Sequence, residues 1–127
     1  MPRTTDHAKF IELLTARFPH IAAGIDDCCQ GLLHPEMGSF ARATRAAIER
    51  GDFATVERHI ALAAEVFATA TPEVENAIYV SYLENIWCYR SDPDYNRARA
   101  MLPPSLANAL EELEKDLRKI HGVQDGH

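Results

Sequence analysis

Apolar side chains recur at every third or fourth position along most of this chain, a pattern typical of amphipathic helices. The first such segment carries Phe10, Leu14 and Phe18. Pro19 follows directly, and proline ends one helix readily and can open the next. No stretch alternates apolar and polar residues for long enough to predict a strand. The pattern therefore predicts an all-α fold.

Turn and cap residues place a helical hairpin in the middle of the chain. Pro35 is placed to open a helix that runs to about Arg50. Gly51 comes next, as expected for a residue that ends a helix in the left-handed conformation, and Asp52 is placed to cap the following helix. Two helices joined by so few residues should pack antiparallel.

Two further helices are predicted from their openings. Thr71 and Pro72 open a helix over about residues 72–89 that is apolar on most sides, as expected of a helix packed centrally between others. A short helical turn is predicted after it over Arg97–Met101, and Ser105 is placed to cap a last, outer helix over about residues 105–121. The apolar positions of this last helix form one seam: Leu106, Leu110, Leu113, Leu117 and Ile120.

The length of the chain limits the number of domains, and its net charge limits the class of partner. A chain of 127 residues suffices for one domain, so we expect a bundle of five or six principal helices over residues 1–122 and a disordered tail over 123–127. The net charge of −6 argues against binding to nucleic acid or anionic lipid and suits a basic protein partner. The most apolar segment is too short and too polar to span a membrane, and the polar N-terminus lacks the apolar core of a secretory signal. We therefore expect a cytoplasmic protein.

The cysteines offer a possible reactive or metal site. Cys28 and Cys29 are adjacent, and His20 and His34 flank them. A zinc site or a Cys–His dyad is imaginable there, but the pair lacks the two-residue gap with which two thiolates grip one zinc ion. We interpret both as structural thiols, and we expect no metal and no cofactor. The chain has three cysteines, an odd number that does not make a disulfide framework, and this favours a reducing compartment.

The stretch VSYLENIWCY interrupts the central apolar helix with Ser81, Glu84 and Asn85, whose spacing puts them on one helical face. Two hypotheses stay open. In one, the three form a structural polar lock, buried and hydrogen-bonded to backbone groups at a neighbouring helix end. In the other, they face a groove that a partner fills. We do not expect an enzyme, since one built on Glu84, His59 or Cys28 would need a pocket in which two of them converge.

The run VENAIYVSYLENI, preceded by T-P-E and, further upstream, by Phe18 and Pro19, resembles a family of small bacterial all-α proteins of unassigned domain type. That family carries a similar V-x-x-x-I-x-V-S-[FY]-L-E-[ND] stretch. The matching residues are Val74, Ile78, Val80, Ser81, Tyr82, Leu83, Glu84 and Asn85. Members are often encoded near polymorphic or contact-delivered bacterial toxins. The resemblance implies an immunity protein, a cytoplasmic inhibitor that binds a cognate toxin domain and blocks its active site.

Such an inhibitor would bind through aromatic anchors and an acidic rim. The candidates in and after the central helix are Tyr89, Asp92, Asp94 and Tyr95. A second acidic patch comprises Asp26, Asp27 and Glu36. The alternative function is a non-enzymatic helical scaffold or adaptor that self-associates as a homodimer through the seam from Leu106 to Ile120.

Overall fold

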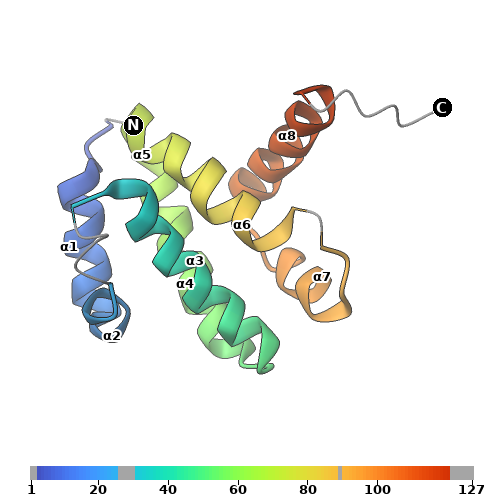
Figure 1. Ribbon diagram of the computed structural model, residues 1–127, viewed down its shortest axis with the longest axis horizontal. Coiled ribbons are helices and arrows are strands. Elements are labelled where there is room, and N and C mark those ends of the chain that lie inside the picture. The colour runs from blue at the N-terminus through green and yellow to red at the C-terminus, as the bar shows by residue number, and fades with distance from the viewer. Residues whose placement is uncertain (1–2, 26–30, 89, 121–127) are drawn as a thin grey trace.

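The computed structural model describes residues 3–25, 31–88 and 90–120, and these residues form helices joined by short turns (Figure 1). The all-α, single-domain fold predicted from the sequence is confirmed. Within the described residues the only β contact is one isolated bridge between Thr5 and Ala70. The predicted tail over 123–127 lies outside the described residues.

The chain begins with a helix pair, α1 (His7–Arg17) and α2 (Pro19–Ala23). Thr5 and Asp6 both have side chains suited to cap α1, and Asp6 is the one that does so, by accepting a hydrogen bond from the backbone N–H of Lys9. Phe18 lies between the two helices, and its side chain is buried in the core. The predicted break at Pro19 is therefore confirmed.

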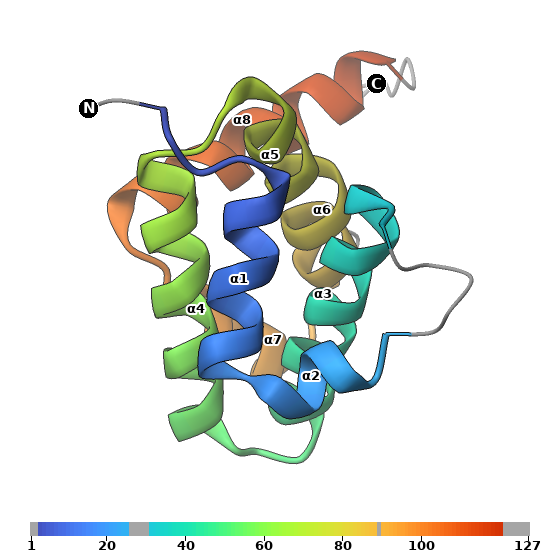
Figure 2. The same ribbon diagram turned by 90° about the vertical axis from the view of Figure 1, so that its left-hand side faces the viewer.

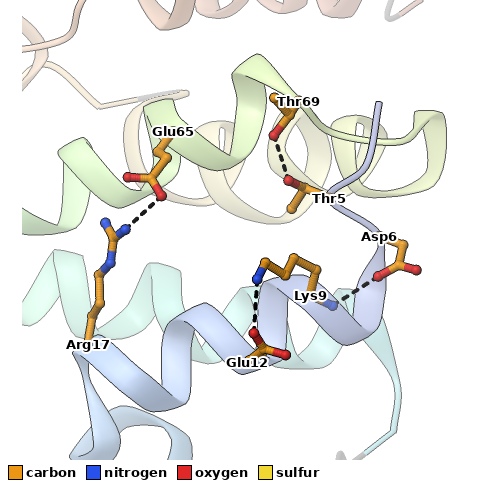
Figure 3. Close-up of polar contacts among 7 residues, drawn as sticks. All are labelled: Thr5, Asp6, Lys9, Glu12, Arg17, Glu65 and Thr69. Carbon is orange, nitrogen blue, oxygen red and sulfur yellow. Dashed lines mark hydrogen bonds and ion pairs between the residues drawn. The ribbon is translucent and has the colours of Figure 1, made fainter. Parts of the chain in front are cut away.

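The N-terminal segment and α1 are both held against the end of α4 (Phe53–Ala68), as Figure 3 shows. The N–H of Thr5 donates to the carbonyl oxygen of Thr69 at 2.9 Å, and the two threonine hydroxyls lie 2.6 Å apart. Further along, Arg17 donates to the carboxylate of Glu65 at 2.6 Å. These contacts fix α1 against α4 at both of its ends.

Helix α3 (Leu33–Glu49) and α4 form the predicted antiparallel hairpin, with α1 lying in front of them in Figure 2. Gly51 has φ 74°, the left-handed conformation expected at this turn. Asp52 caps α4 by accepting from the backbone N–H of Thr55 at 3.2 Å. The predicted start of α3 is wrong by two residues, because α3 begins at Leu33 and Pro35 lies inside its first turn, where no intrahelical N–H donor is needed.

The central helix is continuous from 72 to 87, but it changes geometry on the way. It comprises α5 (Pro72–Ala77), a π-helical segment η1 (Ile78–Leu83) and α6 (Glu84–Trp87). Its buried residues include two rows with a spacing of four: Val74, Ile78, Tyr82 and Ile86, and Leu83 with Trp87. An α-helix has about 3.6 residues per turn, so a strict four-residue repeat drifts around it, whereas a wider π turn of about 4.4 residues reverses that drift. The π segment thus keeps both rows facing the core.

Two further helices complete the fold, α7 (Pro93–Arg99) and α8 (Pro104–Ile120). Helix α7 begins four residues before the predicted turn at Arg97, because Pro93 supplies its first position. Ser105 is not the cap of α8, since the helix already includes Pro104. Helix α8 lies across one end of the bundle, the upper end in Figures 1 and 2, in agreement with its predicted outer place.

In the part of the chain that the structure describes, five long helical segments and two short ones make up the fold, in agreement with the predicted five or six principal helices. No helix of this part is long and apolar enough to cross a membrane. The side chains of Leu106, Leu110 and Leu113 are buried in the core of the same chain. Much of the apolar seam of α8 is therefore already covered.

The left-handed turn at Gly51 generates a test of the hairpin. Gly51→Ala should lower the free energy of unfolding by about 1–2 kcal/mol, because a Cβ atom is strained at positive φ. Gly24→Ala is the matched control, since Gly24 has φ −84° and a Cβ there meets only ordinary contacts at 3.5 Å. Urea denaturation of both variants measures the difference. Equal losses of stability would contradict this account of the turn.

Candidate functional site

The polar residues of the central helix line an open groove beside the start of α3. Its volume is about 460 Å³, and it is lined by His34, Gly38, Val80, Ser81, Glu84, Asn85, Cys88 and Arg90. The Ser81 hydroxyl lies 2.7 Å from Nδ1 of His34, which joins η1 to the first turn of α3. Ser81, Glu84 and Asn85 are each half-buried. The predicted common face is therefore the wall of a groove.

Asn85 makes the contact that comes closest to the predicted polar lock. Its side-chain oxygen accepts a hydrogen bond from Arg45 of α3 at 3.1 Å. Arg90 adds two hydrogen bonds to the end of the central helix, from Nε to the carbonyl oxygen of Ile86 at 2.9 Å and from its terminal nitrogen to that of Asn85 at 3.2 Å. The motif residues thus bond to side chains along α3 rather than to backbone groups at a helix end.

Glu84 differs from its neighbours in the groove. Within the described residues, no hydrogen bond or ion pair reaches its carboxylate, although the side chain is half-buried. Two arginines hydrogen-bond the same helix elsewhere: Arg45 donates to the side chain of Asn85, and Arg90 donates to the carbonyl oxygens of Asn85 and Ile86. A carboxylate partly removed from water without a countercharge is costly, so this one is available to an outside donor.

The groove also brings Ser81 and His34 together as a hydroxyl and a base. No other hydrogen bond orients the His34 ring in the described part of the chain, and Ser81 lies in the middle of a helix, whose N–H groups are engaged by its own backbone. Cys88 is buried, and desolvation raises the pKa of its thiol to about 11, so the thiol stays protonated at neutral pH. The geometry suits hydrogen bonding to a ligand better than nucleophilic attack.

An acidic notch lies next to the groove. It has a volume of about 460 Å³ and is lined by Glu49, Asp92, Pro93, Asp94 and Tyr95. Asp92 and Asp94 are exposed, as their predicted role in partner binding requires. The two cavities adjoin, since the guanidinium of Arg90, which lines the groove, lies 5.2 Å from the ring centre of Tyr95, which lines the notch. We call the groove and the notch together the groove–notch face.

The prediction of Tyr95 as an exposed aromatic anchor is wrong. Only 4% of it is exposed, because its backbone oxygen accepts from the indole N–H of Trp87 at 3.1 Å and its hydroxyl donates to Glu49 at 2.6 Å. Burial and the neighbouring Glu49 carboxylate raise the pKa of the Tyr95 hydroxyl. Tyr95 therefore holds α7 against the central helix and against α3. Its exposed part contributes only to the edge of the notch.

The second predicted acidic patch does not form as expected. The prediction that Glu36 belongs to an acidic surface patch is wrong, since only 5% of this residue is exposed. Its carboxylate accepts from the backbone N–H of Gly31 at 2.7 Å and pairs with Nε2 of His7, so it ties the start of α3 to α1. Asp26 and Asp27 lie outside the described residues.

Other predicted residues also lie outside the described part of the chain. They are Tyr89, proposed for partner binding, and the two adjacent cysteines, Cys28 and Cys29. His20 and His34, which flank the cysteines in the sequence, are both exposed. Among the described residues, no group of three or more His, Cys, Asp or Glu side chains is placed to hold a metal ion.

The sequence analysis missed a polar network in the core. The hydroxyl of Thr44 in α3 lies 2.9 Å from Nδ1 of His59 in α4, 2.9 Å from the hydroxyl of Tyr82 in η1, and 3.2 Å from the carbonyl oxygen of Phe40. A hydroxyl has one proton and two lone pairs. All three bonds form together only if Thr44 donates to Phe40 and accepts from both His59 and Tyr82. This arrangement requires the neutral His59 tautomer with its proton on Nδ1.

The remaining ring nitrogen of His59 agrees with this tautomer. Nε2 is buried without a hydrogen-bond partner, and the ring packs edge-on against Phe18 at 4.7 Å between centroids. Desolvation above all lowers the pKa of His59 to about 4, with repulsion from His20 and Arg58 adding to the effect. The sequence held a signal for the network, since His59 and Thr44 fall on the inward faces of their helices beside Ile60 and Phe40.

The fold and the site together define a small all-α domain with a polar groove built on its central helix. A family model described as Domain of unknown function (DUF7674) matches residues 11–118, and the chain belongs to this family. The match agrees with the expected family of unassigned domain type. A search of curated proteins found no match, and a search of solved structures found none either.

The buried His59 predicts how stability depends on pH. Above pH 6.5 the imidazole is neutral in both states and has no effect; between pH 6.5 and about 4 the unfolded chain takes up a proton that the folded chain does not. The free energy of unfolding should therefore fall as the pH drops through this range, by up to about 3 kcal/mol from this group.

His59→Leu isolates the effect, because it removes the titrating ring while every carboxylate stays. Urea denaturation at a series of pH values gives the free energy of unfolding of the unchanged chain and of the variant. As the pH falls from 7 to 4, the unchanged chain should lose more stability than the variant. A difference that is independent of pH would show that His59 is not held neutral.

Proposed function

We propose that this chain is a non-enzymatic immunity protein, which binds a cognate bacterial toxin domain and blocks its active site. The proposal starts from the resemblance of the VENAIYVSYLENI run to proteins encoded beside toxins. The observation that carries it further is the groove–notch face, where exposed carboxylates and an unpaired, half-buried carboxylate lie close together.

Charge supports a basic partner. The chain carries a net charge of −6, and Asp92, Asp94 and Glu49 add a local concentration of negative charge at the notch. Toxins that act on nucleic acids or nucleotides need basic clefts to hold phosphate. An acidic surface is drawn to such a cleft quickly and can cover it, so inhibition needs no chemistry from the inhibitor.

Rigidity of the groove–notch face supports binding without large rearrangement. Trp87 donates to Tyr95 and so attaches α7 to the central helix. Glu49, which accepts from Tyr95, and Arg45, which donates to Asn85, link these two elements to α3. Surfaces built on packed helices keep their side chains in place, which limits the entropy lost on association. A cytoplasmic location follows from the proposed role, because an immunity protein meets the toxin inside the cell that it protects.

The self-associating scaffold gains no support as a second function. Its interface would need the apolar seam of α8, and the three leucines Leu106, Leu110 and Leu113 are at most 8% exposed in the single chain. Leu117 is half-buried, and it is the only one of the four seam leucines, the seam residues whose side chains the structure describes, that is not buried. One such side chain is far less than a stable helix pair requires.

Co-expression with the toxin domain encoded by the neighbouring gene tests the proposal. The chain should restore growth of a sensitive host and elute with the toxin domain as one complex in gel filtration. Absence of a complex together with continued toxicity would refute the immunity function.

A charge reversal tests the contribution of the notch. Asp94→Lys should weaken toxin binding about tenfold, mainly through slower association, because it reverses an exposed charge at the rim. Glu73→Lys is the matched control: both residues follow the proline that opens a helix, and both are exposed, but Glu73 lies at the far end of the central helix from α7 (Figure 1). Equal effects of the two substitutions, measured by surface plasmon resonance, would show that the notch is not part of the interface.

A further inference from the structure

We propose that the groove is a receptor for one cationic side chain, an arginine of the partner, and that Glu84 is the residue that binds it. The inference rests on the proposed function for the identity of the partner. It goes beyond that function by naming the chemical group that enters the groove and the residue that it meets.

The first argument is the unpaired charge. Glu84 is half-buried in the groove wall, and no hydrogen bond or ion pair reaches its carboxylate within the described residues. Arg90 and Arg45 form no ion pair with it, since the donors of Arg90 are directed at carbonyl oxygens and that of Arg45 at Asn85. A partner cation would supply charge-assisted hydrogen bonds, the stronger kind, to a group that already lacks part of its hydration.

The second argument is the chemistry of the surrounding wall. Asn85 and Ser81 present oxygen atoms beside Glu84, and each oxygen is used by only one side-chain contact, from Arg45 and His34 respectively. An amide oxygen and a hydroxyl oxygen each have a second lone pair. A guanidinium has five N–H donors in one plane, so it can bond a carboxylate with two of them and offer others to such acceptors.

The third argument concerns the apolar rim. Val80 is 44% exposed at the edge of the groove, which makes it one of two large apolar residues found exposed among those described. Arginine carries its charge on an apolar stem that packs well against aliphatic side chains. A valine at the mouth and a carboxylate on the wall therefore match the two parts of one arginine side chain.

The π-helical segment accounts for the shape of this receptor. It spans Ile78–Leu83, includes Val80 and Ser81, and ends directly before Glu84. The wider turn keeps the buried rows facing the core, and Val80, Ser81, Glu84 and Asn85 are left together on the groove side. Single π turns inside helices are found frequently at functional sites, where they aim side chains that a regular helix would place elsewhere.

The test uses a small probe, so that it does not depend on the toxin. Titration of the isotope-labelled chain with N-acetyl-arginine amide should shift the backbone amide resonances of residues 80–88, with a dissociation constant on the order of millimolar. N-acetyl-citrulline amide, which has a similar shape and no charge, should cause no saturable shift. Equal responses to both probes, or shifts confined to the notch around Asp92 and Asp94, would overturn the proposal.

Two variants complete the test. Glu84→Gln should weaken binding of the arginine probe at least tenfold while the melting temperature stays the same or rises, because the substitution removes an unpaired charge and no contact. Asp94→Asn is the control, which changes the notch but leaves the groove intact and should bind the probe as before. Unchanged binding by Glu84→Gln would also overturn the proposal.

The two proposals can fail separately. If the chain neutralises its toxin and Glu84→Gln binds that toxin with unchanged affinity, the arginine receptor is wrong and the immunity function stands. If the arginine probe binds through Glu84 and no toxin is neutralised, the receptor stands and the immunity function is wrong.

Discussion

The arrangement of the helices depends on one buried hydroxyl. Thr44 of α3 bonds His59 of α4 and Tyr82 of the central helix, so one oxygen atom joins three helices within the core. Buried polar groups are costly unless each is paired, which makes other registers of these helices unfavourable. The phase of the central helix against α3 is thereby fixed, and every residue of the groove depends on that phase.

The consequence of this constraint is a helix with two different sides. Its four-residue apolar rows fill the core, and the π turn keeps them there, while the motif residues face α3 across an open groove. Apolar packing and polar contacts are therefore divided between the two sides of one element. Polar contacts such as those between Ser81 and His34 and between Asn85 and Arg45 hold the groove wall in place, and the carboxylate of Glu84 has no partner among the described residues. The two hypotheses for the motif, a polar lock and a partner groove, thus describe different residues of the same stripe.

The sequence predicts the fold well because helix ends are set locally. Asp6 and Asp52 each cap a helix by accepting from an N–H group three residues further on. Gly51 ends a helix through its own left-handed backbone conformation. Burial is decided by residues distant in sequence, and there the prediction fails. Tyr95 and Glu36 belong to polar segments, but each is buried and bonded to a residue distant in sequence. Tyr95 bonds Glu49, and Glu36 pairs with His7. The π segment was also missed, although the strict spacing of four in its apolar rows is a signal for it.

The central claim is that a partner binds at the groove–notch face built on the central helix. Hydrogen exchange of the backbone amides, measured by mass spectrometry on the free chain and on its complex with the toxin domain, tests this claim most directly. The account predicts slower exchange in the complex at η1, at α6, at the first turn of α3 and at residues 90–95. Slower exchange confined to α1 and the outer side of α4, with no change at these segments, would contradict it.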